Sequence, residues 1–172
     1  MRGAYRGVVV VRPARPDEYA AVGELTARVY RTGGFVPAGH PYLATLRDAA
    51  GRARVGELLV AEDECGRLVG SAALIPPGAD RFGDPAAGPA DATLRALVVD
   101  PVGQRAGVGE TLVRACIDRA RSYGALVLWL STLPDMSAAQ RLYRRLGFVR
   151  RPEHDWVAPS GNLLLTFALP LG

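Results

Sequence analysis

A glycine-rich turn between an apolar strand and a helix is the feature that most constrains this chain. Residues 100–113 read DPVGQRAGVGETLV, with three glycines within seven positions. The run before them, Ala92–Val99, predicts a strand, and apolar residues at helical spacing begin inside the turn at Val108. Glycines let a backbone approach a ligand closely, and the first N–H groups of a helix have no partner within it. The stretch therefore predicts a phosphate site, although tight packing alone also produces such turns.

The other segments predict a mixed α/β fold in a single domain over residues 1–172. Strands are expected at Val8–Arg12, Glu57–Glu62, Arg67–Ile75, Ala92–Val99, Ala125–Leu130, Phe148–Arg150 and Leu163–Leu169. Helices are expected from Pro16 to Gly33, over Pro41–Ala50 before a turn at Ala50-Gly51, from Val108 to Gly124, and from a capping Asp135 to Leu146. The order is βααβββαβαββ. Residues 76–90 hold four prolines and three glycines, so we expect a loop there, either functional or a surface insertion.

Composition excludes several classes of protein. All 21 basic residues are arginine, and without a lysine neither a pyridoxal-phosphate Schiff base nor a Walker P-loop can form. The net charge of +4 is modest and the arginines are scattered, so we expect no nucleic-acid partner. The apolar runs are too short to cross a bilayer, so we expect no membrane partner and a cytoplasmic protein.

Cysteine and histidine are too sparse for a metal site or a disulfide framework. Cys65 and Cys116 form no Cys-x-x-Cys pair, and His40 and His154 are isolated in the sequence. We therefore expect no metal cofactor.

A dinucleotide-binding turn is the first alternative, and it fails on spacing and order. That turn needs Gly-x-Gly-x-x-Gly after a first strand and an acid about 20 residues later. Here the pattern is Gly103-x-x-x-Gly107-x-Gly109 after a middle strand, and Gly124 lies near the expected position of the acid.

Two blocks of sequence resemble the GNAT N-acetyltransferase family. Gln104-Arg105-Ala106-Gly107-Val108-Gly109 is similar to that family's (Gln/Arg)-x-x-Gly-x-(Gly/Ala) signature, and it follows a strand that ends Leu97-Val98-Val99-Asp100-Pro101. The stretch from Ala139 to Phe148, AQRLYRRLGF, is similar to the family's Ala-x-x-Leu-Tyr-x-x-x-Gly-Phe ending. The blocks lie in the family's order, and the resemblance spans essentially residues 5–169.

The resemblance implies acetyl-CoA as cosubstrate and a splayed pair of middle strands in a mixed central sheet. The pyrophosphate would bind the amides of Gln104, Arg105, Ala106, Gly107, Val108 and Gly109, with Arg105 adding positive charge. The backbone of Leu97, Val98 and Val99 would contact pantetheine, and an N–H there would stabilise the oxyanion. Tyr143 stands where the family has the tyrosine that protonates the departing thiolate, although a packing role is the alternative.

Two positions depart from the family's pattern. Met136 stands where many relatives have an asparagine, so that contact with pantetheine is either missing or made by Ser137. Thr93 stands where many relatives have a glutamate that acts as general base, and a threonine is no efficient base at neutral pH. Either Asp91, Asp135 or a chain of waters substitutes, or the acceptor amine needs little help from a base, so the sequence leaves the base unassigned.

The acceptor is expected to be a primary amine on a small molecule or a peptide. Phe35 and Tyr42 are candidates for its pocket, and Asp80 and Asp84 for attracting its charge. We expect acetyl transfer by direct attack. A non-catalytic acyl-CoA-binding or sensing module and another nucleotide-binding protein are the alternatives, and a homodimer stays open.

Overall fold

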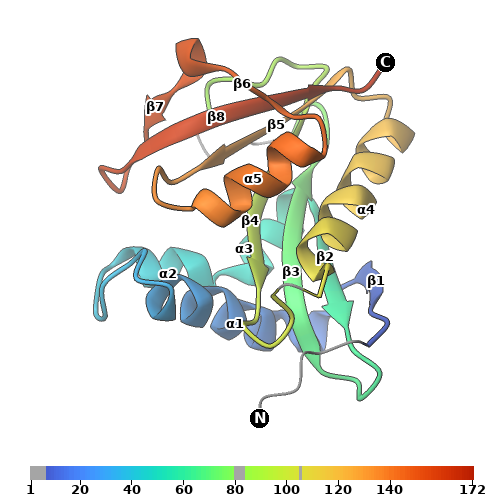
Figure 1. The fold of residues 1–172 in the computed structure, drawn as a ribbon, viewed down its shortest axis with the longest axis vertical. Coiled ribbons are helices and arrows are strands. Elements are labelled where there is room, and N and C mark those ends of the chain that lie inside the picture. The colour runs from blue at the N-terminus through green and yellow to red at the C-terminus, as the bar shows by residue number, and fades with distance from the viewer. Residues whose placement is uncertain (1–6, 80–83, 105) are drawn as a thin grey trace. The chain divides into compact units, whose positions relative to one another are not determined.

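The structure is a computed structural model that describes residues 7–79, 84–104 and 106–172 (Figure 1). The chain divides into two compact units. The first comprises Met1–Ala73 and Ala96–Ala115, and the second comprises Leu74–Arg95 and Cys116–Gly172.

The first unit holds the N-terminal strands and helices. Its elements are β1 (Val10–Pro13), a short 3-10 turn η1 (Pro16–Glu18), α1 (Tyr19–Thr32), α2 (Tyr42–Arg47), α3 (Ala49–Val55), β2 (Glu57–Glu62), most of β3 (Leu68–Ile75), the second half of β4 (Ala92–Val99) and the first half of α4 (Val108–Ser122). The strands follow the order β1-β2-β3-β4, and β1 runs antiparallel to β2.

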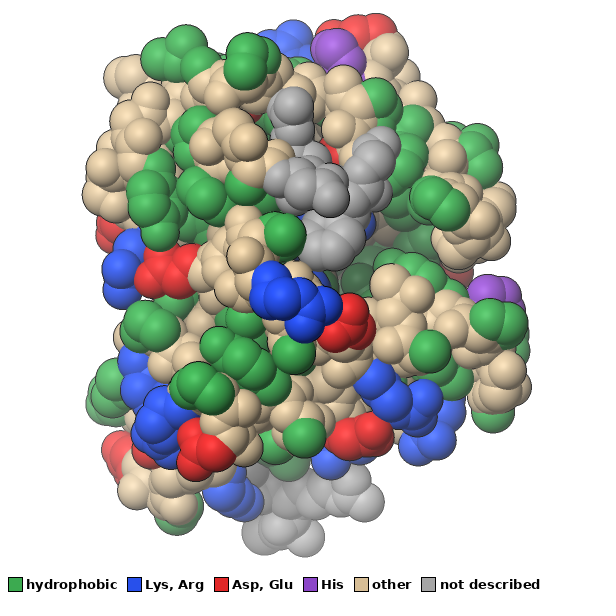
Figure 2. Space-filling model, turned by 180° about the vertical axis from the view of Figure 1, so that it is seen from behind, with side chains coloured by type: hydrophobic (Ala, Val, Ile, Leu, Met, Phe, Trp, Pro, Cys, Tyr) green, Lys and Arg blue, Asp and Glu red, His purple; other side chains and the backbone are tan. Residues whose placement is uncertain are grey.

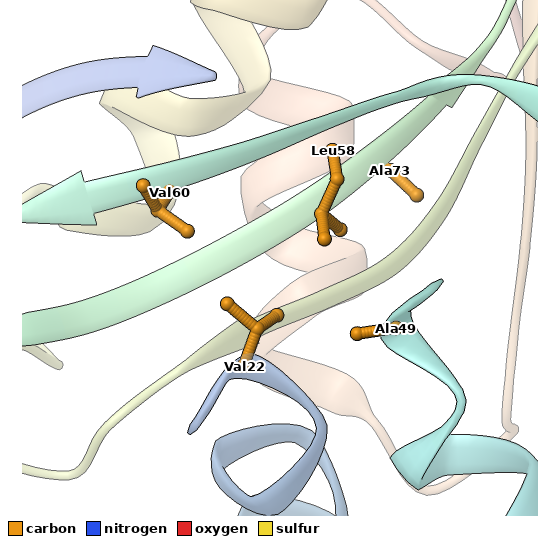
Figure 3. Packing of buried hydrophobic residues seen from close by; sticks show 5 residues of the cluster. All are labelled: Val22, Ala49, Leu58, Val60 and Ala73. Carbon is orange, nitrogen blue, oxygen red and sulfur yellow. The ribbon is translucent and has the colours of Figure 1, made fainter. Parts of the chain in front are cut away.

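Apolar side chains from a helix pair and two strands form one core of this unit. Val22 of α1 and Ala49 of α3 pack against Leu58, Val60 and Ala73, and all five are at most 4% exposed (Figure 3). Burial of such apolar surface is the main stabilising contribution to a fold.

The second unit is a mixed sheet with helices. It holds the end of β3, the first half of β4, the second half of α4, β5 (Val127–Thr132), α5 (Ser137–Arg145), β6 (Val149–Arg150), a 3-10 turn η2 (Pro152–His154), β7 (Trp156–Val157) and β8 (Leu163–Pro170). The strands follow the order β4-β5-β8-β6, and β7 pairs with β8. β4 is parallel to β5, whereas β5, β6 and β7 are each antiparallel to β8. This confirms the predicted mixed α/β fold.

The predicted opening between two middle strands is visible in the pairing of β4. Its ladder with β5 joins Ala92, Thr93 and Leu94 to Leu128, Trp129 and Leu130, while the strand itself continues to Val99. Shortly after the ladder, Ala96 has a φ of 50°, in the left-handed region that costs a residue with a Cβ about 1–2 kcal/mol. Such a backbone kink bends a strand and ends regular pairing.

Three details of the predicted element order are corrected. A helix, α3, occupies the expected turn at Ala50-Gly51, because the Asp48 carboxylate accepts a hydrogen bond from Gly51 N at 2.8 Å and caps it. The N-cap of α5 is Met136, without a side-chain cap, rather than Asp135. The sequence did not predict β7, because a strand of two residues is too short to show an alternation of apolar and polar side chains. None of the helices in the described part of the chain has both the length and the apolar character that a bilayer crossing requires.

Candidate functional site

The predicted site residues divide between the two units. The first holds the predicted CoA-binding positions on β4, the glycine turn and the start of α4, and the second holds Ser137 and Tyr143 on α5. Arg105, the predicted source of positive charge, lies outside the described residues.

Asp100 organises the turn that follows β4. Its backbone carbonyl accepts hydrogen bonds from Gly103 N at 2.8 Å and Gln104 N at 3.1 Å, and its Oδ1 accepts one from Val102 N at 3.1 Å. Gly103 is buried, and a Cβ there would lie 3.2 Å from side-chain atoms of both Val99 and Val108, so the turn closes tightly against its own helix. Close packing thus explains this glycine.

Gly107 serves a different purpose from Gly103. Its φ is 80°, in the left-handed region, and a Cβ on it would meet no atom within 4 Å. Backbone conformation, rather than packing, therefore requires glycine here. α4 begins at the next residue and runs for 15 residues, so the N–H groups of Val108 and Gly109 have no partner within the helix. The positive end of the helix dipole lies at the same place, and this combination favours an anion.

The amides at the start of the predicted phosphate segment are already used within the turn. Gln104 N donates to Asp100 O, and Ala106 N donates to Gly103 O at 3.3 Å. The Gln104 side chain donates from Nε2 to Val99 O at 3.1 Å. The amides that remain suited to a phosphate by position are those at the end of the segment, from Gly107 to Gly109.

The end of β4 supplies the backbone predicted to contact pantetheine. Val98 is buried at 3% exposure, whereas Leu97 and Val99 are partly exposed. All three follow Ala96, beyond the end of the β4–β5 ladder at Leu94. Of their carbonyls, that of Val99 accepts the Gln104 side chain, so a ligand there would compete with or replace that contact.

An ion pair links α1 to the turn. Arg28 Nη2 lies 2.5 Å from Asp100 Oδ2, and about half of the Arg28 side chain is exposed. The sequence analysis missed this pair, because the two residues lie 72 positions apart and neither belongs to the motif. The pair neutralises the carboxylate of the first residue of the turn.

Tyr143 is buried in the second unit, at 5% exposure. Its ring packs against Phe148, with centroids 5.8 Å apart, and against Phe167 of β8, with centroids 6.1 Å apart. α5 thus covers one face of β5 and β8 (Figure 1). The apolar setting agrees with either predicted role, because a phenol packs well against aromatic rings and its hydroxyl can also donate a hydrogen bond.

Ser137 is the first residue of α5 and is exposed. Met136, which stands in place of the family's asparagine, turns its sulfur toward β5, where Thr132 Oγ1 donates to Sδ at 3.4 Å. The Met136 side chain is thus engaged with a strand of its own unit, and Ser137 is the polar side chain that α5 offers at this end.

A polar group of three residues lies on the face of the second unit opposite α5. Thr93 pairs in register with Trp129, and neighbours in a ladder point to the same face of a sheet. Trp129 Nε1 donates to Asp91 Oδ2 at 3.0 Å, and Gly88 N donates to the same oxygen at 2.8 Å. Thr93 is 1% exposed, and its Oγ1 has no hydrogen-bond partner among the described residues. An unpaired buried hydroxyl costs about 1–3 kcal/mol.

A second group of side chains along β8 forms contacts that the sequence analysis did not find. Ser131 and Thr166 pair in register on the face opposite α5, whereas Arg150 lies over the Phe167 ring on the α5 face. Trp156 Nε1 donates to Ser131 Oγ at 3.1 Å, and Thr166 Oγ1 donates to the carbonyl of His154 at 2.8 Å. Arg150 forms an ion pair with Asp155, and this contact with the guanidinium, followed by the Thr166 N–H, lowers the pKa of the Asp155 carboxyl. The alternation of side-chain directions along β8 is the sequence signal that would have placed Thr166 on the face opposite α5.

The predicted acceptor-pocket residues contact apolar side chains in the first unit. Tyr42 packs against a buried cluster that contains Val36 and Leu43, and the Phe35 ring meets Tyr30 edge-on at 6.3 Å. Of the two loop acids, Asp84 is buried at 7% exposure, with Oδ1 accepting from Ala86 N, and Asp80 lies outside the described residues.

Charge and metal ligands are dispersed. On the face drawn in Figure 2, basic side chains are interspersed with acids and apolar groups rather than massed. Across residues 7–79, 84–104 and 106–172, no three His, Cys, Asp or Glu side chains gather as metal ligands.

Comparison with known proteins was made on sequence and on structure. The sequence profile of the Acetyltransferase (GNAT) family matches residues 21–148. The [ribosomal protein bS18]-alanine N-acetyltransferase of Salmonella typhimurium is 41% identical over 58 residues, which are 34% of this chain and 39% of that enzyme. The chain thus aligns with well under half the length of that relative.

Solved structures share the fold. An acetyltransferase of the GNAT family from Staphylococcus aureus Mu50 superposes with a TM-score of 0.75 at 16% identity, covering 96% of this chain and 100% of that one. A GNAT family acetyltransferase from Brucella melitensis, in complex with acetyl-CoA, superposes with a TM-score of 0.64 at 23% identity, covering 96% and 90%.

Proposed function

Since the chain belongs to the acetyltransferase (GNAT) family, we propose that residues 1–172 form one cytoplasmic N-acetyltransferase domain that moves an acetyl group from acetyl-CoA to a primary amine. The observation that carries this proposal is the turn before α4. Gly107 adopts a left-handed conformation there, and the helix begins with N–H groups that have no partner within it. A solved structure of the same fold holds acetyl-CoA.

The CoA pyrophosphate is assigned to the amides of Gly107, Val108 and Gly109. Gln104, Arg105 and Ala106 precede them in the proposed CoA-binding segment, and Arg105 adds positive charge. The phosphates carry negative charge, and the N-terminus of α4 offers both hydrogen-bond donors and the positive end of a dipole. The pantetheine arm is assigned to the backbone of Leu97, Val98 and Val99, where β4 has left its ladder with β5. Ser137 is assigned a contact with the same arm.

The chemistry is a direct transfer. The neutral amine attacks the thioester carbon, and a backbone N–H of β4 stabilises the oxyanion that forms. The C–S bond then breaks, and the departing thiolate takes its proton from the Tyr143 hydroxyl. The nitrogen loses its excess proton to solvent, and the Tyr143 oxygen regains a proton from solvent, so the enzyme returns to its starting state. No covalent acyl-enzyme intermediate is needed, and no metal ion takes part.

The acceptor is a primary amine carried by a small molecule or by a peptide. The bS18-alanine N-acetyltransferase acts on an alanine of a ribosomal protein, which supports including peptide amines. A non-catalytic acyl-CoA-binding module is the second candidate, and Thr93 favours it, because this residue stands where many relatives have a glutamate base.

An amine screen with acetyl-CoA tests the proposal. Free CoA thiol is measured against a panel of small amines and of peptides, including some with N-terminal alanine, while binding of acetyl-CoA, NAD and ATP is measured separately. We expect binding of acetyl-CoA alone and release of CoA with at least one class of amine. Tight binding of acetyl-CoA without transfer to any amine would favour the sensing module, and preference for NAD or ATP would reject both candidates.

A further inference from the structure

The proposed transfer requires a proton acceptor that the family resemblance does not provide. An ordinary alkylamine is mostly protonated at neutral pH, and it must lose a proton before its nitrogen can attack. Thr93 stands where many relatives have a glutamate, and a hydroxyl cannot take that proton efficiently. This inference rests on the proposed function and concerns how the second unit meets this requirement.

The Thr93 hydroxyl lacks a protein partner where one would be expected. It is 1% exposed, and its Oγ1 makes no hydrogen bond among the described residues. Buried hydroxyls are nearly always paired, either with protein groups or with ordered water. A hydroxyl both donates and accepts, so the unpaired Oγ1 is suited to hold one water molecule or one polar group of a ligand.

A carboxylate is held by the strand partner of Thr93. Asp91 directly precedes β4 and lies two residues before Thr93 in the sequence. Trp129, the ladder partner of Thr93, donates from its indole to Asp91 Oδ2 at 3.0 Å, and Gly88 N donates to the same oxygen at 2.8 Å. Both donors hold Oδ2, which fixes the carboxylate and leaves Oδ1 for a further donor.

We propose that Asp91 is the proton acceptor of the transfer and that Thr93 positions the water through which the proton reaches it. One proton passes from the acceptor ammonium to the water, and one proton of that water passes to the Asp91 carboxylate. The products are a neutral amine, whose lone pair attacks the thioester, and a carboxylic acid that later returns its proton to solvent. Thr93 neither gains nor loses a proton overall, so it is a positioning residue.

In the described part of the segments next to Asp91, the other titratable or charged groups include three side chains. Asp84 is in the same loop, Arg95 is two residues beyond Thr93 on β4, and His154 contacts the Trp129 ring with centroids 5.0 Å apart. His154 is the competing proton acceptor, and Asp84 is a buried acid whose Oδ1 accepts from Ala86 N. Both therefore enter the test as separate variants.

The first test is the pH dependence of kcat/KM in Asp91→Asn. The amide oxygen of asparagine still accepts from Trp129 Nε1 and Gly88 N, so the packing is preserved while the basic carboxylate is removed. We expect about a 10²-fold loss near neutral pH, with the ascending limb of the profile moved up to the amine's own pKa and acetyl-CoA affinity unchanged. Asp84→Asn and His154→Gln should keep the wild-type profile.

The second test uses Thr93, where two substitutions of similar size separate the hydroxyl from the packing. Thr93→Val should lower kcat about tenfold near neutral pH, and the deficit should shrink as the pH approaches the amine's own pKa. Thr93→Ser, which keeps the hydroxyl, should retain most of the activity. A merely structural role would leave the shape of the pH profile unchanged in both variants.

The outcomes separate this inference from the proposed function. An active wild-type enzyme with the same pH profile in Asp91→Asn and Thr93→Val would overturn the relay and leave the transferase intact. If the ascending limb of the pH profile shifted in His154→Gln instead, His154 would be the proton acceptor and the role of Asp91 would be rejected. A wild-type protein that transfers acetyl to no amine would reject both proposals together.

Discussion

Arg28 and Asp100 form an ion pair, with 2.5 Å between Nη2 and Oδ2, that ties α1 to the first residue of the glycine turn. Asp100 also accepts the N–H groups of Gly103 and Gln104 on its carbonyl. One residue thus shapes the turn through its backbone and is neutralised through its side chain. An unpaired carboxylate here would repel the phosphates that we assign to the turn.

Replacing Arg28 by glutamine should therefore weaken acetyl-CoA binding. Exposed ion pairs are worth about 0–1 kcal/mol, so we expect a loss of about two- to fivefold that diminishes at high salt. The measurement is the dissociation constant by calorimetry at low and high ionic strength. The double variant Arg28→Gln/Asp100→Asn should recover the wild-type affinity, because it removes both charges.

Arg47 provides the matched control for this prediction. Arg47 lies in α2 and forms an exposed ion pair with Glu24 of α1, the helix that also carries Arg28, with 2.9 Å between Nε and Oε1. Arg47→Gln removes the same charge from the protein without freeing a carboxylate at the turn. Equal affinities of the two single variants would show that only net charge matters and would reject a role for the Arg28–Asp100 pair.

Gly107→Asp should weaken acetyl-CoA binding much more than it weakens the fold. The substitution places a negative side chain at the proposed phosphate site, and it forces a residue with a Cβ into a left-handed conformation, which costs about 1–2 kcal/mol. Gly124→Asp is the control, because Gly124 has a φ of 71°, also meets no atom within 4 Å and lies beyond the other end of α4. We expect comparable losses of stability by urea unfolding, but a loss of ligand affinity in the first variant alone.

The segment from β4 to α4 is the part of the fold that the sequence determines most clearly. The structure has the predicted strand bounds, Ala92–Val99, and the predicted helix start at Val108. Both could be predicted because apolar periodicity and glycines at turns are local features of the sequence. α3 was missed because its sequence, AAGRARV, has no apolar period, and its start depends on a hydrogen bond from Gly51 N to Asp48.

Features that depend on contacts between residues far apart in the sequence could not be predicted from the sequence alone. The Trp129–Asp91 hydrogen bond joins residues 38 positions apart, and it requires the parallel register of β4 with β5. The Arg28–Asp100 pair likewise requires the packing of α1 in the first unit. The use of the Gln104 amide within the turn follows from backbone geometry, which a motif does not specify.

Tyr143→Phe separates chemistry from packing at α5. Phenylalanine keeps the ring contacts with Phe148 and Phe167, so the stability should change little. Without the hydroxyl, protonation of the leaving thiolate is lost, and turnover should fall on the order of 10²-fold while acetyl-CoA affinity stays within about twofold. The check is steady-state kinetics with an accepted amine. The exposed Tyr123→Phe serves as control, and equal turnover in both variants would make Tyr143 a packing residue.

Glu18 makes the first unit sensitive to acid. Its carboxylate accepts two hydrogen bonds from Arg12, at 2.7 and 2.9 Å, and one from Arg15 N at 2.8 Å. The Arg12 bonds are the main cause that lowers the pKa of Glu18 from 4.5 to about 2, and the backbone N–H of Arg15 adds to them. Arg12 also bonds Glu62, so the three side chains join η1 to β1 and β2, and the same contacts raise the pKa of Arg12.

Because the folded-state pKa of Glu18 lies below its unfolded value, its contribution to stability is complete above about pH 4.5 and is lost as the pH falls toward 2. The pair is partly open to solvent, so we expect a contribution on the order of 1–2 kcal/mol. Glu18→Gln, which is uncharged throughout, should unfold at lower urea concentration than wild type at pH 6, and the difference should narrow by pH 3. Asp17→Asn, at an exposed neighbour, should match wild type at both values. A constant difference between Glu18→Gln and wild type from pH 6 to pH 3 would show that the contribution is not linked to this titration.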